Sequence, residues 1–271
     1  MRTKKAVINT MTSIMAEVVS IICGLILPRL ILGAFGSSYN GITSSITQFL
    51  SCIVLLRAGV GSVTRAALYN PLSKKDKSEI SGIVNATAIF MKKVALIYVG
   101  ALIVFACVYP FLVRNSFSWI FSATLVLIIG SSTFVDNYFG IAYQMLLQAD
   151  QKNYVNTIPQ IVTTILNTIV AAVLIHCGAG IHLVKLGSAI VYFIRPLFLS
   201  YYVKKKYEID ADIKPNNSAI SQRWDAFAQQ AAAFVNNNTD VIVLTMFSDI
   251  KEVSVYTCLL YTSPSPRDAH E

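Results

Sequence analysis

VINTMTSIMAEVVSIICGLILPRLIL, residues 7–32, is long and apolar enough to cross a membrane, yet polar residues recur through it at helical spacing. A helix rises about 1.5 Å per residue, so about 20 apolar residues span a hydrocarbon core of about 30 Å. Because lipid offers no hydrogen-bonding partner, the polar face of such a helix should lie against protein or a watery cavity. The polar or small residues recur every three or four positions, on one helical face: Asn9, Ser13, Ala16, Ser20 and Gly24.

Two further apolar segments carry stripes of the same kind, and apolar stretches in the chain predict seven membrane-spanning helices. The second segment contains Ser44, Gln48, Ser51, Gly59, Ser62 and Arg65, and the fifth contains Asn156, Gln160, Thr163 and Asn167. The predicted helices lie at about 7–32, 42–69, 89–113, 118–147, 157–176, 181–203 and 225–247. A membrane protein with a polar interior is most simply a transporter.

The composition supports this fold class, which is an all-α polytopic membrane protein. Charged residues make up 13% of the 271 residues and hydrophobic residues 55%, whereas a soluble domain carries about 25% charged residues. The mean hydropathy is +0.59. A basic balance, here a net charge of +8, can also indicate nucleic-acid binding. We expect no nucleic-acid partner, because the positions of the basic residues have a topological explanation.

That explanation is a bias of lysine and arginine toward alternate loops. With the N-terminus in the cytoplasm, fourteen basic residues lie on the inner side and three on the outer side, Arg114, Lys185 and Lys251. Cytoplasmic loops carry such an excess in membrane proteins. The sequence therefore predicts a multi-pass protein of the cell inner (cytoplasmic) membrane, with inner-face lysines that can touch anionic lipid headgroups.

The loops suggest how the chain is divided. The charged loop 204–223 predicts a boundary between a six-helix N-terminal lobe, residues 1–205, and the first helix of a second lobe, 224–257, with 206–223 as a cytoplasmic loop. Residues 258–271, CLLYTSPSPRDAHE, resemble translated sequencing-adaptor sequence, so we expect a non-native tail on a truncated chain. A genuine short polar C-terminus is the alternative.

Ionisable residues at membrane depth are the sharpest functional signal. Two interpretations compete: cations in a watery cavity would attract an anionic head group such as a diphosphate, or the buried charges pair with one another and fix helix packing. Asp136 and Arg195 favour the structural interpretation, and Arg29 and Arg65 lie near helix ends, where their charges reach the interface easily. The candidate substrate-binding residues are Glu17, Gln48, Arg57, Arg65, Asn167 and Asp240.

Motifs for other chemistry are missing from the sequence. It contains no G-x-x-x-x-G-K-[ST], G-x-S-x-G or H-E-x-x-H, and its five cysteines and three histidines show no metal-ligand spacing. We therefore expect no enzyme activity, no cofactor and no metal, and energy supplied by an ion gradient or by the substrate's own gradient.

Three stretches resemble the polysaccharide (oligosaccharide-lipid) flippase family, whose superfamily also holds the MATE drug exporters. They are LPRLILGAFGSSYNG at 27–41, LLRAGVGSVTRAAL at 55–68 and NNNTDVIVLTMFSDIKEVSVY at 236–256. The chain departs from the family pattern at Arg57-Ala58, where an acidic residue is common, and at Ser248-Asp249, where glycine is usual. The resemblance extends over residues 1 to about 257.

The resemblance implies a transporter that flips a lipid-diphosphate-linked oligosaccharide for surface polysaccharide biosynthesis, such as lipopolysaccharide O-antigen or capsule. It implies two six-helix lobes around a central cavity, membrane lipids as neighbours, and polysaccharide polymerase machinery as a further partner. Three alternatives stay open. They are a MATE-like cation-coupled exporter with Glu17 and Asp240 in the central role, an inactive fragment, and a membrane polysaccharide polymerase or ligase, which the short outer loops disfavour.

Overall fold

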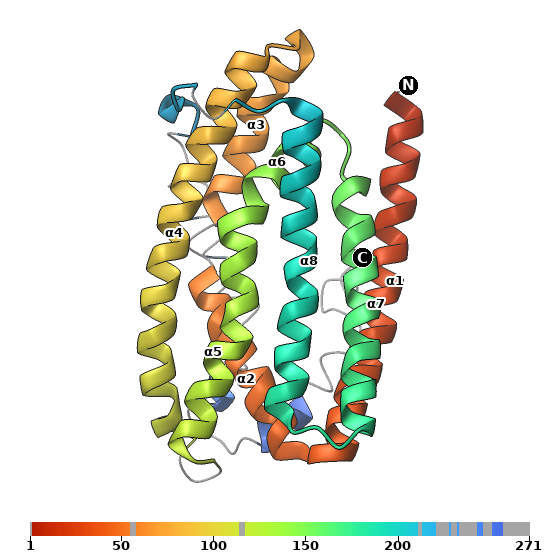
Figure 1. Cartoon of the computed structure of the whole chain (residues 1–271), viewed down its shortest axis with the longest axis vertical. Helices are drawn as coiled ribbons and strands as arrows, with labels where there is room; N and C mark the ends of the chain where they lie inside the picture. The colour runs from red at the N-terminus through yellow and green to blue at the C-terminus, as the bar shows by residue number, and fades with distance from the viewer. Residues whose placement is uncertain are drawn as a thin grey trace.

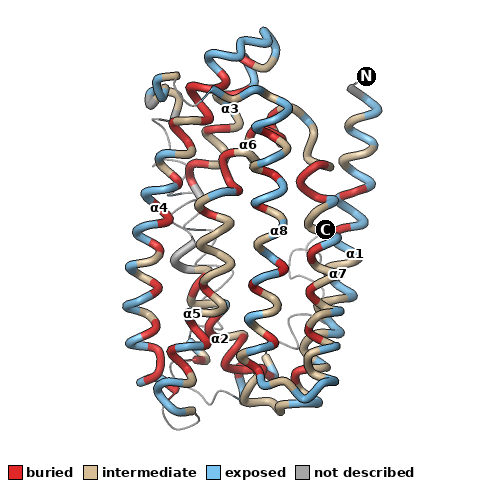
Figure 2. Tube along the Cα trace, in the orientation of Figure 1, coloured by how far each residue is buried: buried red, intermediate tan, exposed pale blue. Residues whose placement is uncertain are grey.

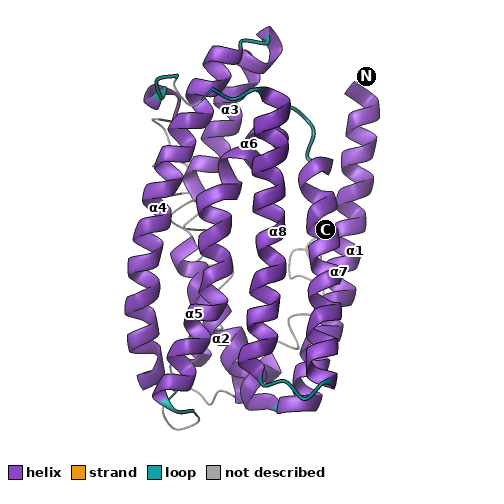
Figure 3. Ribbon diagram, in the orientation of Figure 1, coloured by secondary structure: helices purple, strands orange, loops and turns teal. Residues whose placement is uncertain are grey.

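The computed structural model of this chain describes residues 2–54, 58–113, 117–210, 213–220, 228, 232, 243–245 and 251–256. No strand occurs in this part of the chain, and nearly all of it is helical (Figure 3). The helices run along the long axis of the molecule (Figure 1). They are α1 (Arg2–Phe35), α2 (Ser37–Val54), α3 (Ala58–Lys74), α4 (Lys77–Leu112), α5 (Trp119–Val135), the π-helical turn η2 (Asp136–Gly140), α6 (Ile141–Ala149), α7 (Tyr154–His176), α8 (Ile181–Tyr207) and the 3₁₀ turn η3 (Asn217–Ile220).

Five helices among the described residues are long and apolar enough to cross a membrane, which confirms the all-α polytopic class. They are Thr3–Phe35, Lys77–Leu112, Trp119–Ala149, Tyr154–His176 and Ile181–Tyr207. Large apolar side chains cover their outer sides, for example Leu96 on α4, which is 71% exposed, and Met11 on α1, which is 66% exposed. Figure 2 shows exposed positions along α1, α4, α7 and α8, whereas the span Trp119–Ala149 is exposed mainly near its beginning. Such a surface suits contact with lipid.

Two of the seven predicted helices are not found as single spans in the described residues. The predicted helix 42–69 corresponds to α2 and α3, and residues 55–57 between them lie outside the described part of the chain. The predicted helix 225–247 falls almost wholly outside it.

The spanning helices form a row, with α2 and α3 packed against it. α1 packs on α7, α7 on α8, α8 on α5, and α5 on α4, as Figure 1 shows. α2 contacts α1, α4 and α5, whereas α3 contacts α4 and α6. One apolar cluster joins α2, α4 and α5 around Tyr98 and Leu125, and a second joins α3, α4, α6 and α8 around Leu146 and Leu199.

The packing of α4 on α5 is closest at Gly130. A Cβ added to Gly130 would lie 2.8 Å from Leu102 Cδ2, so no larger residue fits without movement. The Gly130 carbonyl accepts a hydrogen bond from the Tyr98 hydroxyl at 3.1 Å. Tyr98 is fully buried, so this bond satisfies a polar group inside the bundle.

The helix α4 begins earlier than the sequence pattern predicted. The sequence predicted that this helix begins at about residue 89, but α4 starts at Lys77. Asp76 explains the start, because its carboxylate accepts a hydrogen bond from the Glu79 backbone N–H at 3.0 Å and caps the helix. Lys75 adopts a positive φ of 58° in the short turn that separates α3 from α4.

The fourth predicted span, 118–147, is confirmed as the continuous helix Trp119–Ala149, but it contains a π-helical turn. Residues Asp136–Gly140 form this turn, which inserts an extra residue into the helix. On one side of it α5 packs on α2, α4 and α8, and on the other side α6 packs on α3, α4 and α8.

Candidate functional site

A polar cavity of about 370 Å³ lies between α1, α2, α5, α7 and α8. Among the residues that the structure describes, one cation, Lys185, and one amide, Asn167, line it together with apolar residues. The other polar residues of this described lining carry hydroxyl groups: Thr47, Ser51, Ser132, Thr133, Ser188 and Tyr192.

Asn167 is a predicted site residue that the structure places in this cavity. The polar stripe of α7 faces the protein interior as expected, because Asn156, Thr163 and Asn167 are all buried. The Asn167 amide nitrogen donates a hydrogen bond to the Tyr192 hydroxyl at 3.2 Å. Its Oδ1 atom is buried without a hydrogen-bond partner. A buried amide with unused hydrogen-bonding capacity is available to a ligand.

Lys185 is the charged residue of the cavity, and the sequence pattern did not single it out. The topology count placed it with the outer loops, but it lies within α8 and lines the cavity. The spacing of Lys185, Ser188 and Tyr192 puts them on one face of α8. Among the described residues Lys185 has no ion pair or hydrogen bond, and no carboxylate lines this cavity.

Two predicted residues on α2 and α3 lie at different levels of the bundle. Gln48 is half-buried on α2, beside the cavity-lining Thr47, and it has a hydrogen-bonding or electrostatic partner. Arg65 does not line the cavity. Its Nη1 atom donates to Gln148 Oε1 at 2.8 Å, which links α3 to α6.

The other three predicted residues do not join Asn167 in the described structure. Glu17 is exposed on α1 and lines none of the described cavities. Arg57 and Asp240 lie outside the described residues. Of the six predicted residues, Asn167 is the one that lines the cavity in the described structure.

Arg195 illustrates how this bundle satisfies a charge at membrane depth. Its Nε and Nη2 atoms both donate to Asn156 Oδ1, at 3.2 and 2.9 Å. Asn156 is buried and belongs to the polar stripe of α7. This contact links α8 to α7 and is consistent with a role of Arg195 in helix packing.

A separate cluster of charged and hydroxyl groups links α1 to the turn after α6 and to the end of α8. The Asp150 carboxylate accepts a hydrogen bond from the Tyr207 hydroxyl at 2.5 Å, pairs with Lys152, and lies 3.6 Å from the Lys5 ammonium. Burial raises the pKa of Asp150, but hydrogen bonds from Lys152 and Tyr207 and the charges of Lys152 and Lys5 outweigh it and hold the pKa below its ordinary value. Because these groups already pair with one another, we assign the cluster a structural role.

The polar cavity presents donors and a positive charge to whatever enters it. A lysine ammonium has three donors and no acceptor, and an anion is the partner that would satisfy it. The surrounding hydroxyls can bind the polar oxygens of the same ligand. No protein family, curated protein or solved structure matches this chain.

Proposed function

We propose that the protein is a membrane transporter that binds the anionic head group of a lipid-diphosphate-linked oligosaccharide and flips it across the cytoplasmic membrane for surface polysaccharide biosynthesis. One observation carries the proposal: Lys185 faces a polar cavity inside a membrane-spanning bundle and has no partner among the described residues. A cation that lines a cavity inside a membrane-spanning bundle marks a candidate substrate or ion pathway.

The sign of the charge favours this substrate over a cationic drug. A cation exporter needs carboxylates in its cavity, whereas the lining here combines a lysine with an amide and hydroxyls. A diphosphate fits that set, because charge-assisted hydrogen bonds to phosphate oxygens are roughly twice as strong as neutral ones. Sugar hydroxyls can exchange hydrogen bonds with the serine, threonine and tyrosine hydroxyls.

The size of the cavity limits what it holds at one time. Its volume of about 370 Å³ is at the lower end of the about 300–1,000 Å³ of small-molecule sites. We infer that it holds the diphosphate end of the substrate, while the lipid tail stays in the bilayer. Binding must not favour one face of the membrane strongly, because a ligand shifts a conformational equilibrium only by its differential affinity.

The test is a flipping assay on the full chain in proteoliposomes. A fluorescent lipid-diphosphate-linked oligosaccharide is placed in both leaflets, and a membrane-impermeant quencher reports how fast the protected pool becomes accessible. Wild type should flip the lipid. Lys185→Ala should weaken the binding of this lipid to the protein by roughly 10- to 150-fold, since one hydrogen bond to a charged group contributes about 1.5–3 kcal/mol.

Two control variants separate a binding role from a folding role. Lys185→Arg keeps the positive charge and should keep most of the activity, and Lys205→Ala removes an exposed lysine from the same helix and should leave flipping unchanged. Equal flipping by Lys185→Ala and wild type would overturn the role of the cavity. If the wild-type chain flips nothing, the inactive-fragment alternative is the better account, and flipping of cationic drugs would favour the MATE-like one.

A further inference from the structure

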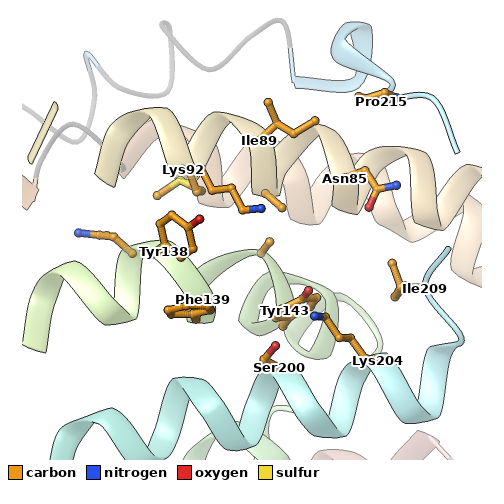
Figure 4. Close-up of a pocket in the computed structure, with 14 residues that line it drawn as sticks. Asn85, Ile89, Lys92, Tyr138, Phe139, Tyr143, Ser200, Lys204, Ile209 and Pro215 are labelled. Atoms are coloured by element: carbon orange, nitrogen blue, oxygen red, sulfur yellow. The ribbon is translucent and has the colours of Figure 1, made fainter. Parts of the chain in front are cut away.

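A second cavity, of about 290 Å³, lies between α4, η2, α6 and α8 (Figure 4). Lys92 extends into it from α4 and Lys204 from α8, with Tyr138 and Tyr143 on the helix between them. We call this cavity the lysine groove. It does not share a lining residue with the cavity around Asn167 and Lys185.

The lysine groove lies at the depth of lipid headgroups. On α4 the residues after Lys93 form an apolar stretch, 94–112, that is roughly 28 Å long at 1.5 Å per residue. This length matches a hydrocarbon core of about 30 Å, so Lys92 lies at its edge. Lys204 likewise follows directly after the apolar part of α8. Both ammonium groups are therefore expected at one membrane–water interface.

Exposed apolar residues lie in and beside the groove, a surface that suits contact with lipid. Ile89 and Phe139 line it and are 45% and 39% exposed. Leu197 and Tyr201, which precede Lys204 on α8, are 52% and 67% exposed. Tyrosines are also enriched at membrane interfaces, where the ring is in apolar surroundings and the hydroxyl is wet.

The two lysines of the groove have no acidic partner in the described part of the chain. No carboxylate lines the groove there, and neither Lys92 nor Lys204 forms an ion pair. Lys92 lies over the ring of Tyr138, 5.5 Å from its centroid. Two nearby carboxylates already have cationic partners, since Glu208 accepts from Lys77 at 2.5 Å and Asp150 pairs with Lys152.

Hydrogen bonds to backbone atoms hold the rim of the groove in place. Asn85 donates from Nδ2 to the backbone oxygens of Asp210 and Ile213, at 2.8 and 3.1 Å. The Asn216 backbone N–H donates to the Gly82 oxygen at 3.0 Å. These bonds hold the segment after α8 against α4, so that Ile209 and Pro215 close one end of the groove. The two lysines therefore face a preformed site.

We propose that the lysine groove binds the phosphate of an anionic membrane phospholipid, with Lys92 and Lys204 on the phosphate oxygens and the acyl chains along the exposed apolar surface of α4 and α8. A phosphate ester is the anion available at this depth. If the lysine-rich end faces the cytoplasm, as the loop charges predict, the groove meets the leaflet that carries anionic lipid. The inference does not depend on what the protein transports.

The experiment is native mass spectrometry of the full chain in detergent, titrated with phosphatidylglycerol or with phosphatidylcholine of the same acyl chains. Wild type should bind phosphatidylglycerol in preference. Lys92→Ala/Lys204→Ala should lower that preference at least tenfold, as expected for loss of hydrogen bonds to a charged group. The neighbouring pair Lys93→Ala/Lys205→Ala removes the same charge from the same helices, outside the lining of the groove, and should change it less than about threefold.

Further variants and ligands make the assignment specific. Lys204→Ala alone changes an exposed residue, so it is expected to fold, and it too should lower the preference. Lys92→Arg/Lys204→Arg should keep it. Equal losses in the two double-alanine variants, or no preference in wild type, would overturn the proposal. Displacement of the lipid by inorganic phosphate at equal concentration would also overturn the proposal, because it would assign the groove to a soluble anion. Tighter binding of a polyprenyl diphosphate would overturn it as well, because it would assign the groove to a transported lipid.

Discussion

Replacement of Gly130 by alanine should destabilise the bundle at the contact between α4 and α5. The new Cβ would lie 2.8 Å from Leu102 Cδ2, which is inside van der Waals contact, and Leu102 is buried, so it cannot simply turn outward. Overpacking of this kind costs about 1–3 kcal/mol. A shift of α5 to relieve it would also weaken the bond from Tyr98 to the Gly130 carbonyl, worth about 0.5–1.5 kcal/mol.

Thermal unfolding of the detergent-solubilised protein, followed by helical circular dichroism, measures this effect. The gain in helix propensity, about 0.5–1 kcal/mol, offsets part of the cost, so Gly130→Ala should lose about 0.5–4 kcal/mol in all. At about 2–4 °C per kcal/mol, the midpoint should fall by roughly 1–16 °C. The matched control is Gly100→Ala on α4, where an added Cβ meets nothing within 4 Å. That variant should gain stability, by about 0.5–1 kcal/mol of helix propensity.

A double-mutant cycle with Leu102→Ala identifies the clash. Truncation of Leu102 by itself lowers the stability, but it removes the atoms that the Cβ of the Gly130→Ala variant would meet. The two changes should therefore couple favourably, by about 1–3 kcal/mol. Unchanged stability of Gly130→Ala, or additive effects of the two changes, would refute the reasoning.

Two further predictions concern the end of the bundle that carries the N-terminus. Because the pKa of Asp150 is lower in the folded protein than its ordinary value, its contribution to stability is present above pH about 4 and is lost as the pH falls through the folded pKa. The thermal unfolding midpoint of the wild type should therefore decrease when the pH is lowered below about 4. Asp150→Asn should flatten this pH dependence. An equally steep decrease in that variant would assign the effect to other groups. Asp76→Ala removes the cap of α4 and should cost about 1 kcal/mol, seen as faster hydrogen exchange at residues 77–80; unchanged exchange there would contradict the capping role.

Hydropathy alone predicted the long helices, because membrane length and apolar composition constrain them directly. The predicted ends of the helices at 157–176 and 181–203 agree with α7 and α8 to within a few residues. The start of α4 was missed because its first turns are polar and charged. The signal was present in Asp76 and Glu79, which have the spacing of a helix cap.

The polar cavity was predicted in part. The polar stripe of α7 indicated that Asn167 faces the interior, because the helical period alone determines on which face of a helix a residue lies. Lys185 was missed because it lies close to a turn, where a basic residue is normally counted with the loop. Its spacing with Ser188 and Tyr192 was the available signal. The contact between Arg195 and Asn156 depends on how α7 and α8 are placed against each other, which one sequence does not specify.

The π-helical turn at Asp136–Gly140 has a consequence for tolerance of sequence change. The wider turn absorbs one extra residue, so the apolar pattern of the sequence shifts by about 100° across it while α6 keeps its place against its neighbours. A single-residue deletion inside the turn would restore a regular helix and leave the side chains of α6 close to their present partners on α3. The same deletion within α5 or α6 would rotate the residues beyond it by about 100°, so this span should lose a residue far more readily within the turn than elsewhere.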